Sequence, residues 1–239
     1  MKIYATSAEL KAKARESLAG HYLSFAGVFI TLYVLQYLIV VPSGILELPQ
    51  PFGIIFYYGL NFVLELFFAI FKVGLTLIFL SNATHQPVFS NSVFTGFWHS
   101  PIKAMQIQCL PSLLLFLPTL LSDLFIQQFF MTRNTQWLLY ALVVSLIFLP
   151  YVLFVEILYS QVFYIMLDFP EMTPSECLRS ARKLIKGNKR RYLYIVLSFL
   201  PLSLLGALSC GIGNLLIYPY QEQTFAYFYL DLIEKKQAV

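Results

Sequence analysis

Residues 137–167 read WLLYALVVSLIFLPYVLFVEILYSQVFYIML, and Glu156 is the one charged residue among them. About 20 apolar residues are enough for an α-helix to cross the hydrocarbon core of a bilayer. The stretch therefore predicts a transmembrane helix, and similar apolar runs lie on both sides of it. We expect such helices at about residues 22–41, 54–81, 105–125, 137–167, 192–209 and 214–233.

The composition of the whole chain agrees with a membrane location. Of the 239 residues, 59% are hydrophobic and 12% are charged, and the mean hydropathy is +0.72. Ordinary soluble domains carry about 25% charged residues. Half that share cannot cover the surface of a globule of 27.5 kDa, which excludes a soluble enzyme.

The predicted fold is all-α: a polytopic membrane protein with six transmembrane helices in one domain, residues 1–239. Pro42 would end the first helix, and Gly211-Ile-Gly213 would form the turn before the last. Consecutive helices would pair as three hairpins, over residues 22–81, 88–168 and 192–235. The middle unit would begin near Val88, with Phe94-Thr-Gly-Phe97 at the membrane interface.

The positions of Lys and Arg predict the orientation. With six spans and a cytoplasmic N-terminus, all Lys and Arg residues except Lys72 and Arg133 fall on the cytoplasmic side, which is 14 of the 16. Cytoplasmic loops of membrane proteins carry such an excess of basic residues. Both termini are therefore expected in the cytoplasm. The net charge of +4 then belongs to the inner membrane face and does not indicate nucleic-acid binding.

Two cytoplasmic segments, residues 1–21 and 173–191, match at a constant offset of 167 positions. Each contains T-x-x-E, a capping box in which Thr and Glu bind each other's backbone amides, and each ends in a helix-stopping Gly, Gly20 or Gly187. Apolar residues also coincide along one helix face: Leu10, Ala14 and Leu18 correspond to Cys177, Ala181 and Ile185. We interpret both segments as amphipathic helices on the inner leaflet, each preceding a hairpin in a repeated unit. A chance match between two short basic helices is the alternative.

The basic residues of these two segments are expected to contact anionic lipid headgroups. Each Lys or Arg near such a surface contributes about 1 kcal/mol to binding. Protein or ligand binding is the alternative use of the same charges. The residues concerned are Lys11, Lys13, Arg15, Arg179, Arg182, Lys183, Lys186, Lys189, Arg190 and Arg191.

Several short stretches together form a pattern that is typical of one protein family. They are Glu9-Leu-Lys, Ala14-Arg15, Leu18-Ala-Gly20, SECLRSARKLIKGN at residues 175–188, Leu197-Ser-Phe199, Gly211-Ile-Gly213, Pro219-Tyr220, Thr224 and Phe228-Tyr229. In these the chain resembles an uncharacterised family of bacterial membrane proteins, catalogued as domain-of-unknown-function family nine-seven-five. Leu200-Pro201 departs from the family pattern, which has Gly and an aromatic residue there. The resemblance implies six helices in a bacterial plasma membrane and brings no established activity and no catalytic residues.

Four ionisable residues fall well inside the predicted spans, away from their ends: Glu65, Lys72, Glu156 and Glu222. An unpaired charge at the bilayer centre costs at least about 2.5 kcal/mol, so these side chains should point into the bundle. At about 100° per residue, Asn61, Glu65 and Lys72 share one face of the second helix. Counted from the cytoplasmic helix ends, Lys72, Glu156 and Glu222 lie within about 3 Å of a common depth.

This cluster has a structural and a functional interpretation. In the structural one, Lys72 pairs with Glu156 or Glu222 and fixes how the helices pack. In the functional one, a single Lys cannot neutralise three carboxylates, so at least one Glu is expected to be protonated at neutral pH. A protonatable carboxylate beside a Lys is what a proton-coupled or cation pathway requires.

The sequence thus favours a non-enzymatic integral membrane protein of the bacterial cell envelope. It would act through lipids or through other membrane proteins. A small transporter or a proton or cation pathway is the alternative. We expect no catalytic residues, no cofactor and no metal site, because neither a nucleophile–base pair nor a metal-ligand cluster is visible.

Overall fold

The structure is a computed structural model that describes residues 4–45, 52–87, 90–98, 100–209 and 211–237. Within these residues the regular elements are all helices, which confirms the all-α prediction. In chain order they are α1 (Ser7–Leu18), α2 (Tyr22–Ile45), α3 (Phe52–Ala83), the 3₁₀ helix η1 (Ser90–Phe97), α4 (Pro101–Thr132), α5 (Gln136–Tyr159), α6 (Val162–Asp168), α7 (Pro174–Ile185), α8 (Lys189–Leu208) and α9 (Ile212–Gln237).

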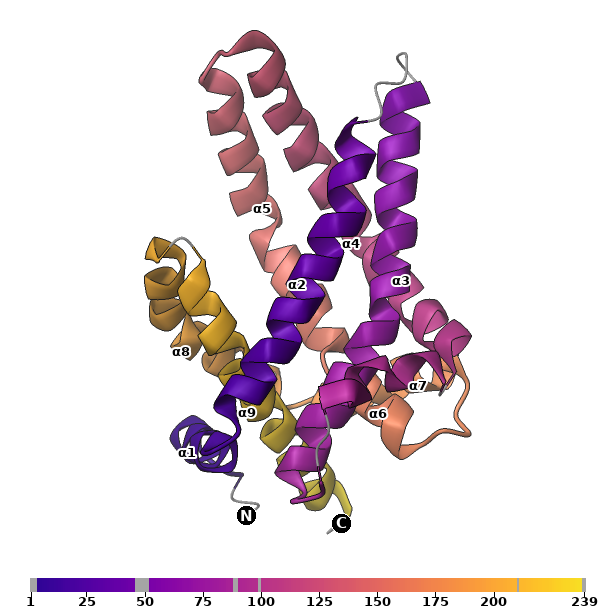
Figure 1. Cartoon of the computed structure of the whole chain (residues 1–239), viewed down its shortest axis with the longest axis vertical. Coiled ribbons are helices and arrows are strands. Elements are labelled where there is room, and N and C mark those ends of the chain that lie inside the picture. Colours follow the sequence, from indigo (N-terminus) through magenta and orange to yellow (C-terminus); the bar gives the residue numbers. More distant parts are fainter. Residues whose placement is uncertain (1–3, 46–51, 88–89, 99, 210, 238–239) are drawn as a thin grey trace.

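The long helices extend from the end of the molecule where both termini and α1 lie (Figure 1). Several boundaries differ from the prediction, and α4 extends beyond the predicted residues 105–125 at both ends. α2 continues past Pro42 to Ile45, because a proline is tolerated in a membrane helix when its neighbours satisfy the backbone. The predicted fourth helix is interrupted at Ser160 and Gln161, between α5 and α6. Val88 lies outside the described residues, and the segment after it forms η1 rather than a capped α-helix.

Four of the described helices are long and apolar enough to cross a membrane. They are α3 from Phe56 onward, α4, α5 together with α6, and α8. α1 and α2 are bent by 93° relative to each other, and they add a fifth if the pair is one span. The chain is therefore compatible with a multi-pass membrane protein, although six spans were predicted. The sixth predicted helix is present as α9, but the polar run Gln221-Glu-Gln-Thr224 makes it less apolar.

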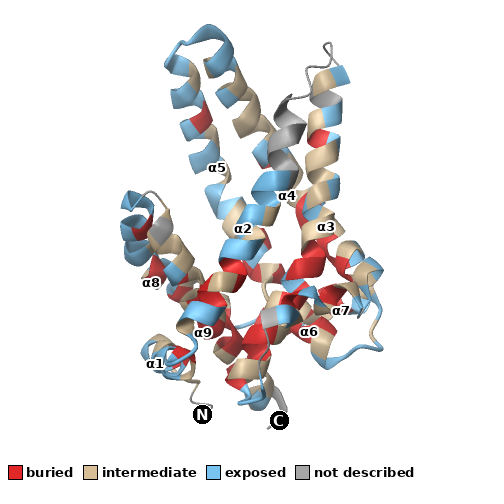
Figure 2. Ribbon diagram, viewed as in Figure 1, coloured by how far each residue is buried: buried red, intermediate tan, exposed pale blue. Residues whose placement is uncertain are grey.

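α9 lies among other helices, which explains how it can carry that polar run. It packs against α1, α2, α3 and α8, and Gln223, Thr224 and Ala226 are fully buried. Aromatic stacking joins it to its neighbours, as between Phe29 and Tyr218 at 5.9 Å. Figure 2 shows the buried residues concentrated around α9 and the lower part of α3, whereas the far ends of α4 and α5 are exposed.

The exposed ends of α4 and α5 hold together by polar contacts between the two helices. Pro118 cannot donate to the carbonyl four residues earlier, that of Leu114. The Tyr151 hydroxyl donates to this carbonyl oxygen at 3.1 Å, and the Ser122 and Ser145 hydroxyls meet at 3.2 Å. The outward side chains of α5, such as Leu146 and Ile147, are apolar and exposed, as lipid-facing residues are.

Both predicted capping boxes are present. Thr6 N–H donates to Glu9 Oε2 at 2.8 Å, and Thr173 N–H donates to Glu176 Oε2 at 2.7 Å. The hydrogen bonds from Thr173 lower the pKa of Glu176 below its ordinary value of 4.5. This stabilising contribution is therefore present above about pH 4.5 and is lost as the pH falls through the lowered pKa. Gly20 and Gly187, which follow the two helices, have φ of +85° and +89°, a conformation that favours glycine.

The apolar faces of α1 and α7 are covered by the protein's own helices. All six predicted positions, Leu10, Ala14, Leu18, Cys177, Ala181 and Ile185, are at most 2% exposed. α1 packs against α9 and α3, and α7 packs against α6, α4 and α5. The apolar faces of both helices therefore pack on the bundle itself, and the position of the two helices on the inner leaflet stays a prediction.

η1 contacts the backbone of α3 directly. A Cβ atom on Gly74 would lie 2.0 Å from the carbonyl oxygen of Val93, and one on Gly96 would lie 2.1 Å from that of Ile70. Only hydrogen atoms fit between the two segments at these positions. The contact holds η1 against the middle of α3, with Phe71 and Phe97 edge to face at 5.0 Å.

Replacing Gly74 by Ala is expected to lower the melting temperature of the detergent-solubilised protein, because the added methyl group would force η1 away from α3. Gly59→Ala is the matched control, since Gly59 lies on the same helix and a methyl group there meets nothing within 4 Å. Ala is favoured over Gly in a helix by about 0.5–1 kcal/mol, so the control should be neutral or stabilising. Equal melting temperatures for the two variants would contradict the contact.

Candidate functional site

A cavity of about 700 Å³ lies between α2, α3, α4 and α9. Along α3 its lining runs from Tyr57 to Leu75, a length of about 27 Å at 1.5 Å per residue. α3 begins at the end of the molecule away from the termini (Figure 1), so the cavity extends from near that end to beyond the middle of α3. Its polar and charged lining residues, tyrosines aside, are Gln36, Asn61, Glu65, Lys72, Ser112, Thr119, Asp123 and Glu222.

The structure brings Asn61, Glu65, Lys72 and Glu222 together in the lining of this cavity and leaves Glu156 outside it. Glu156 is exposed on α5. Its charge nevertheless acts on Lys72, as do those of Glu65 and Glu222. Asn61 donates to the backbone carbonyl of Tyr57 at 2.8 Å, a bond within its own helix.

Gln108 of α4 connects Lys72 with Glu65. Lys72 Nζ donates to Gln108 Oε1 at 3.4 Å, and Gln108 Nε2 donates to Glu65 Oε1 at 3.1 Å and to Ser112 Oγ at 3.0 Å. Lys72 forms no direct ion pair with a carboxylate in the described part of the chain. The predicted pairing of Lys72 with Glu156 or Glu222 is therefore not formed, because the Gln108 amide takes the place of a carboxylate partner.

Two carboxylates of the cavity lining make no direct polar contact in the part of the chain that the structure describes. Among the described residues, neither Asp123 nor Glu222 makes a hydrogen bond or an ion pair. Asp123 lies on α4 toward the end away from the termini, and Glu222 lies on α9 at the other end of the cavity with Lys72. A carboxylate in such a place needs water, a proton or a cation to offset its charge.

Aromatic side chains make up most of the remaining wall. Tyr33 stacks on Tyr218 at 6.2 Å, and Phe62 meets Phe116 edge to face at 6.2 Å. All four helices contribute rings. The nine aromatic residues of the lining are Phe29, Tyr33, Tyr57, Tyr58, Phe62, Phe68, Phe71, Phe116 and Tyr218.

A polar contact closes the end of the bundle next to Glu222. Asn82 Nδ2 donates to Gln223 Oε1 at 2.9 Å and to the carbonyl oxygen of Ser17 at 3.2 Å. Gln223 Nε2 donates to the carbonyl oxygen of Phe79 at 3.3 Å. These bonds tie α1, α3 and α9 together on the side of the cavity that faces the termini.

Polar groups also continue past this closure, near the break between α5 and α6. The Gln161 side-chain oxygen and the Tyr164 hydroxyl are buried, and neither has a hydrogen-bond partner in the described structure. Tyr164 stacks on Tyr229 at 4.9 Å, and the Tyr229 hydroxyl donates to Asp168 at 2.5 Å. Asp168 is exposed, so polar side chains lead from this break to the surface.

The predicted lipid-contact residues divide into two groups. Lys13, Arg15, Arg179, Arg182, Lys183, Lys186 and Arg190 are exposed. Three others are half-buried and make internal contacts. Lys11 Nζ donates to the carbonyl oxygen of Ser198 at 3.0 Å, and Lys189 lies 4.6 Å from the centre of the Phe154 ring. Arg191 forms an ion pair, so it is not free to meet a lipid headgroup.

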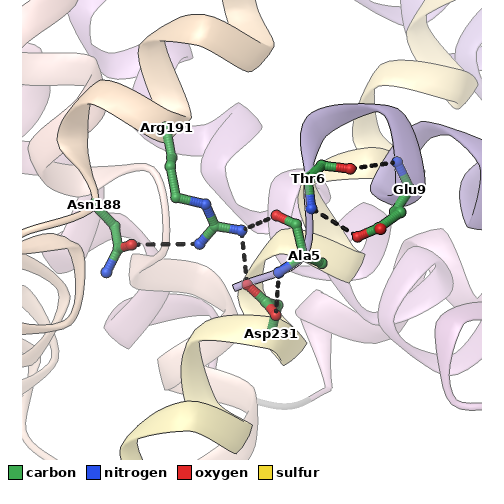
Figure 3. Close-up of polar contacts among 6 residues, drawn as sticks. All are labelled: Ala5, Thr6, Glu9, Asn188, Arg191 and Asp231. Carbon is green, nitrogen blue, oxygen red and sulfur yellow. Dashed lines mark hydrogen bonds and ion pairs between the residues drawn. The ribbon is translucent and has the colours of Figure 1, made fainter. Parts of the chain in front are cut away.

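Arg191 joins the N-terminal segment to α8 and α9 (Figure 3). Its guanidinium bonds to Asp231 at 2.7 Å and donates to the carbonyl oxygen of Ala5 at 2.6 Å. Ala5 N–H in turn donates to Asp231 at 3.2 Å, so both carboxylate oxygens are bound. Asn188 accepts a further bond from Arg191 at 3.3 Å.

The comparisons with known proteins identify the family. The model for a family described as "protein of unknown function (DUF975)" matches residues 1–236. The chain belongs to this family. Neither a curated protein nor a solved structure matches the chain. The resemblance noted in the sequence is thus confirmed, and it carries no activity to this DUF975 chain.

Sequence reasoning missed two residues of this DUF975 site: Gln108, which binds Lys72 and Glu65, and Asp123 of the cavity lining. Both lie on the apolar helix α4. A signal was present for Gln108, because Ser112 follows four positions later and marks one polar face. Asp123 lies two residues before the predicted end of the third helix at residue 125, so it is not among the charges predicted deep in the bilayer, whereas α4 continues to Thr132.

Arg191→Met in the DUF975 chain is expected to lower the free energy of unfolding by about 3 kcal/mol, because Asp231 would keep a nearly buried charge without its partner. Unfolding by SDS in mixed micelles provides the measurement. Arg190→Met is the control, since Arg190 is exposed and surface substitutions change stability by less than about 0.5 kcal/mol. A similar effect of both substitutions would contradict the role given to the ion pair.

Proposed function

We propose that this protein is a non-enzymatic, multi-pass protein of the bacterial plasma membrane that binds a cation in its cavity and forms part of a path for it through the bilayer. The observation that carries the proposal is the pair of carboxylates, Asp123 and Glu222, that line the cavity without a partner among the described residues. The sequence favoured a role through lipids or membrane proteins. Because of the cavity, we now favour the cation path over a role through lipids or membrane proteins.

The charges of the lining support a cation rather than an anion. Three carboxylates, Glu65, Asp123 and Glu222, share the cavity with one cation, Lys72. Lys72 shares an amide partner with Glu65, and its charge also acts on Glu222, so the lining keeps an excess of negative charge. Ionisable residues inside membrane helices are costly and commonly mark the path of an ion or a proton.

The arrangement also suggests how such a path is gated. Transport requires that a central site open to one side of the membrane at a time. The cavity lies toward the end away from the termini, and the contacts of Asn82 with Gln223 and Ser17 close the opposite side. For the cation to pass, these hydrogen bonds would have to open. The cation would then reach the polar groups near Tyr164 and Asp168.

We further propose six membrane crossings in three hairpins, with both termini cytoplasmic. α9 can be the sixth crossing despite its polar run, because α1, α2, α3 and α8 pack around it. The repeated unit is supported by matching boundaries: α1 and α2 begin at residues 7 and 22, and α7 and α8 begin 167 positions later, at 174 and 189.

The exposed basic residues favour anionic lipid headgroups as additional partners. Arg179, Arg182, Lys186 and Arg190 are exposed near the end of the molecule that the positive-inside rule places in the cytoplasm. This surface would anchor the protein at the inner leaflet through its charges, since the apolar faces of α1 and α7 are already covered. A membrane-protein partner is the other class that such a surface fits.

Cation flux into proteoliposomes tests the proposed path. Under an imposed pH or potassium gradient, the wild-type protein is expected to carry flux, and Glu222→Gln is expected to remove most of it, because the carboxylate that offsets the cation's charge is lost. Glu234→Gln is the control, since Glu234 is exposed on the same helix. Absence of wild-type flux under both gradients, with the protein folded, would contradict the proposal.

Cysteine labelling tests the topology and the lipid contact. In a chain without its native cysteines, Arg133→Cys is expected to react with a membrane-impermeant maleimide in intact cells, whereas Lys186→Cys reacts only after lysis. Protection of position 133 would overturn the six-span arrangement.

The same Lys186→Cys variant tests the lipid contact. Its reaction with the maleimide is expected to be slower in phosphatidylglycerol liposomes than in phosphatidylcholine liposomes, because anionic headgroups would cover the cysteine. Equal rates in the two kinds of liposome would exclude the headgroup contact.

A further inference from the structure

The walls of the cavity combine features that select for one class of cation. Nine aromatic residues from four helices surround it. Aromatic rings attract a cation over their faces, and they also bury the apolar surface of a ligand. A small hydrated ion would use the carboxylates and would leave these rings without a role. An ion with an apolar body would use both.

The carboxylates of the cavity lining are placed to bind one positive charge on a ligand that is otherwise apolar. Gln108 ties Lys72 to Glu65, and the charge of Lys72 also acts on Glu222. The three carboxylates of the lining nevertheless exceed its one cation by two charges, and Asp123 and Glu222 lie at opposite ends of a lining that runs along about 27 Å of α3. The rings of Phe62, Phe116 and Tyr218 lie in the wall together with them.

We propose that the cavity is a binding site for an amphiphilic organic cation, meaning a compact apolar body that carries one positive charge. This inference rests on the proposed function and names the class of cation. The volume of about 700 Å³ is within the range of about 300–1,000 Å³ that is usual for small-molecule sites. Glu222 offsets the charge at the closed end of the cavity, and Asp123 provides a second position for it at the other end.

Tetraphenylphosphonium and tetraphenylborate provide the test, because they have nearly the same size and shape and opposite charge. Each is dialysed against the purified full chain in lipid nanodiscs, and binding to empty nanodiscs is subtracted. The wild-type protein is expected to bind tetraphenylphosphonium saturably and not to bind tetraphenylborate. Glu222→Gln is expected to weaken binding of the cation by about tenfold, since one opposite charge is removed.

Glu234→Gln is the matched control. Glu234 lies on the same helix as Glu222, but it is exposed and does not line the cavity, so its replacement should leave the affinity unchanged. If Glu222→Gln does not fold, Asp123→Asn replaces it with the same expectation. Phe116→Leu should weaken binding by about threefold through the loss of one ring.

Equal affinity for the two probes, or an affinity that neither carboxylate substitution changes, would overturn the inference. The proposed function has a separate outcome. If flux of protons or potassium depends on Glu222 but tetraphenylphosphonium does not bind, the proposed cation path is supported and the proposed organic-cation site is rejected. Saturable, Glu222-dependent binding without any flux would confirm the site and remove the path.

Discussion

A polar group placed among apolar helices must find its partner within the protein, because a surrounding bilayer offers none. Much of this structure depends on that constraint. The guanidinium of Arg191 and the carboxylate of Asp231 meet each other and the backbone of Ala5, and they thereby fix α1, α8 and α9 relative to one another. The Tyr151 hydroxyl binds the carbonyl that Pro118 leaves free, and it holds α5 against α4. Gln223 and Asn82 satisfy each other where α3 and α9 meet.

In the cavity, only some of the polar groups have a partner within the protein. Gln108 gives Lys72 and Glu65 a shared partner, whereas Asp123 and Glu222 have none among the described residues. Each of these carboxylates needs water, a proton or a cation to offset its charge, and the proposed function assigns this part to a cation that enters and leaves the cavity. The aromatic walls then indicate what else such an occupant brings with it. The same physical rule thus accounts for the rigid part of the bundle and for its candidate site.

Features that depend on neighbouring residues in the chain were predictable. The capping boxes follow from Thr and Glu three positions apart, and the shared face of Asn61, Glu65 and Lys72 follows from helical periodicity alone. Features that depend on contacts between helices were not. Gln108 could be recognised as polar, but its position between Lys72 and Glu65 depends on how α4 packs against α3. The apolar stripe of α1 likewise predicts a buried face without indicating whether lipid or α9 buries it. The interruption at Ser160 and Gln161 has no strong breaker residue to mark it.

The hydrogen bond between Ala5 and Asp231 joins residues 226 positions apart. A ribosome makes the first of these residues long before the second, and earlier helices enter the membrane while α9 is still unmade. During that time the N-terminal segment has no Asp231 to bind, and Arg191 has no counter-ion. Assembly of the bundle is therefore completed from its last helix: when α9 arrives, it supplies the missing carboxylate, fills the space between α2, α3 and α8, and forms one wall of the cavity. A chain that stopped short of α9 would lack the carboxylate that pairs with Arg191 and the helix that packs against α1, α2, α3 and α8.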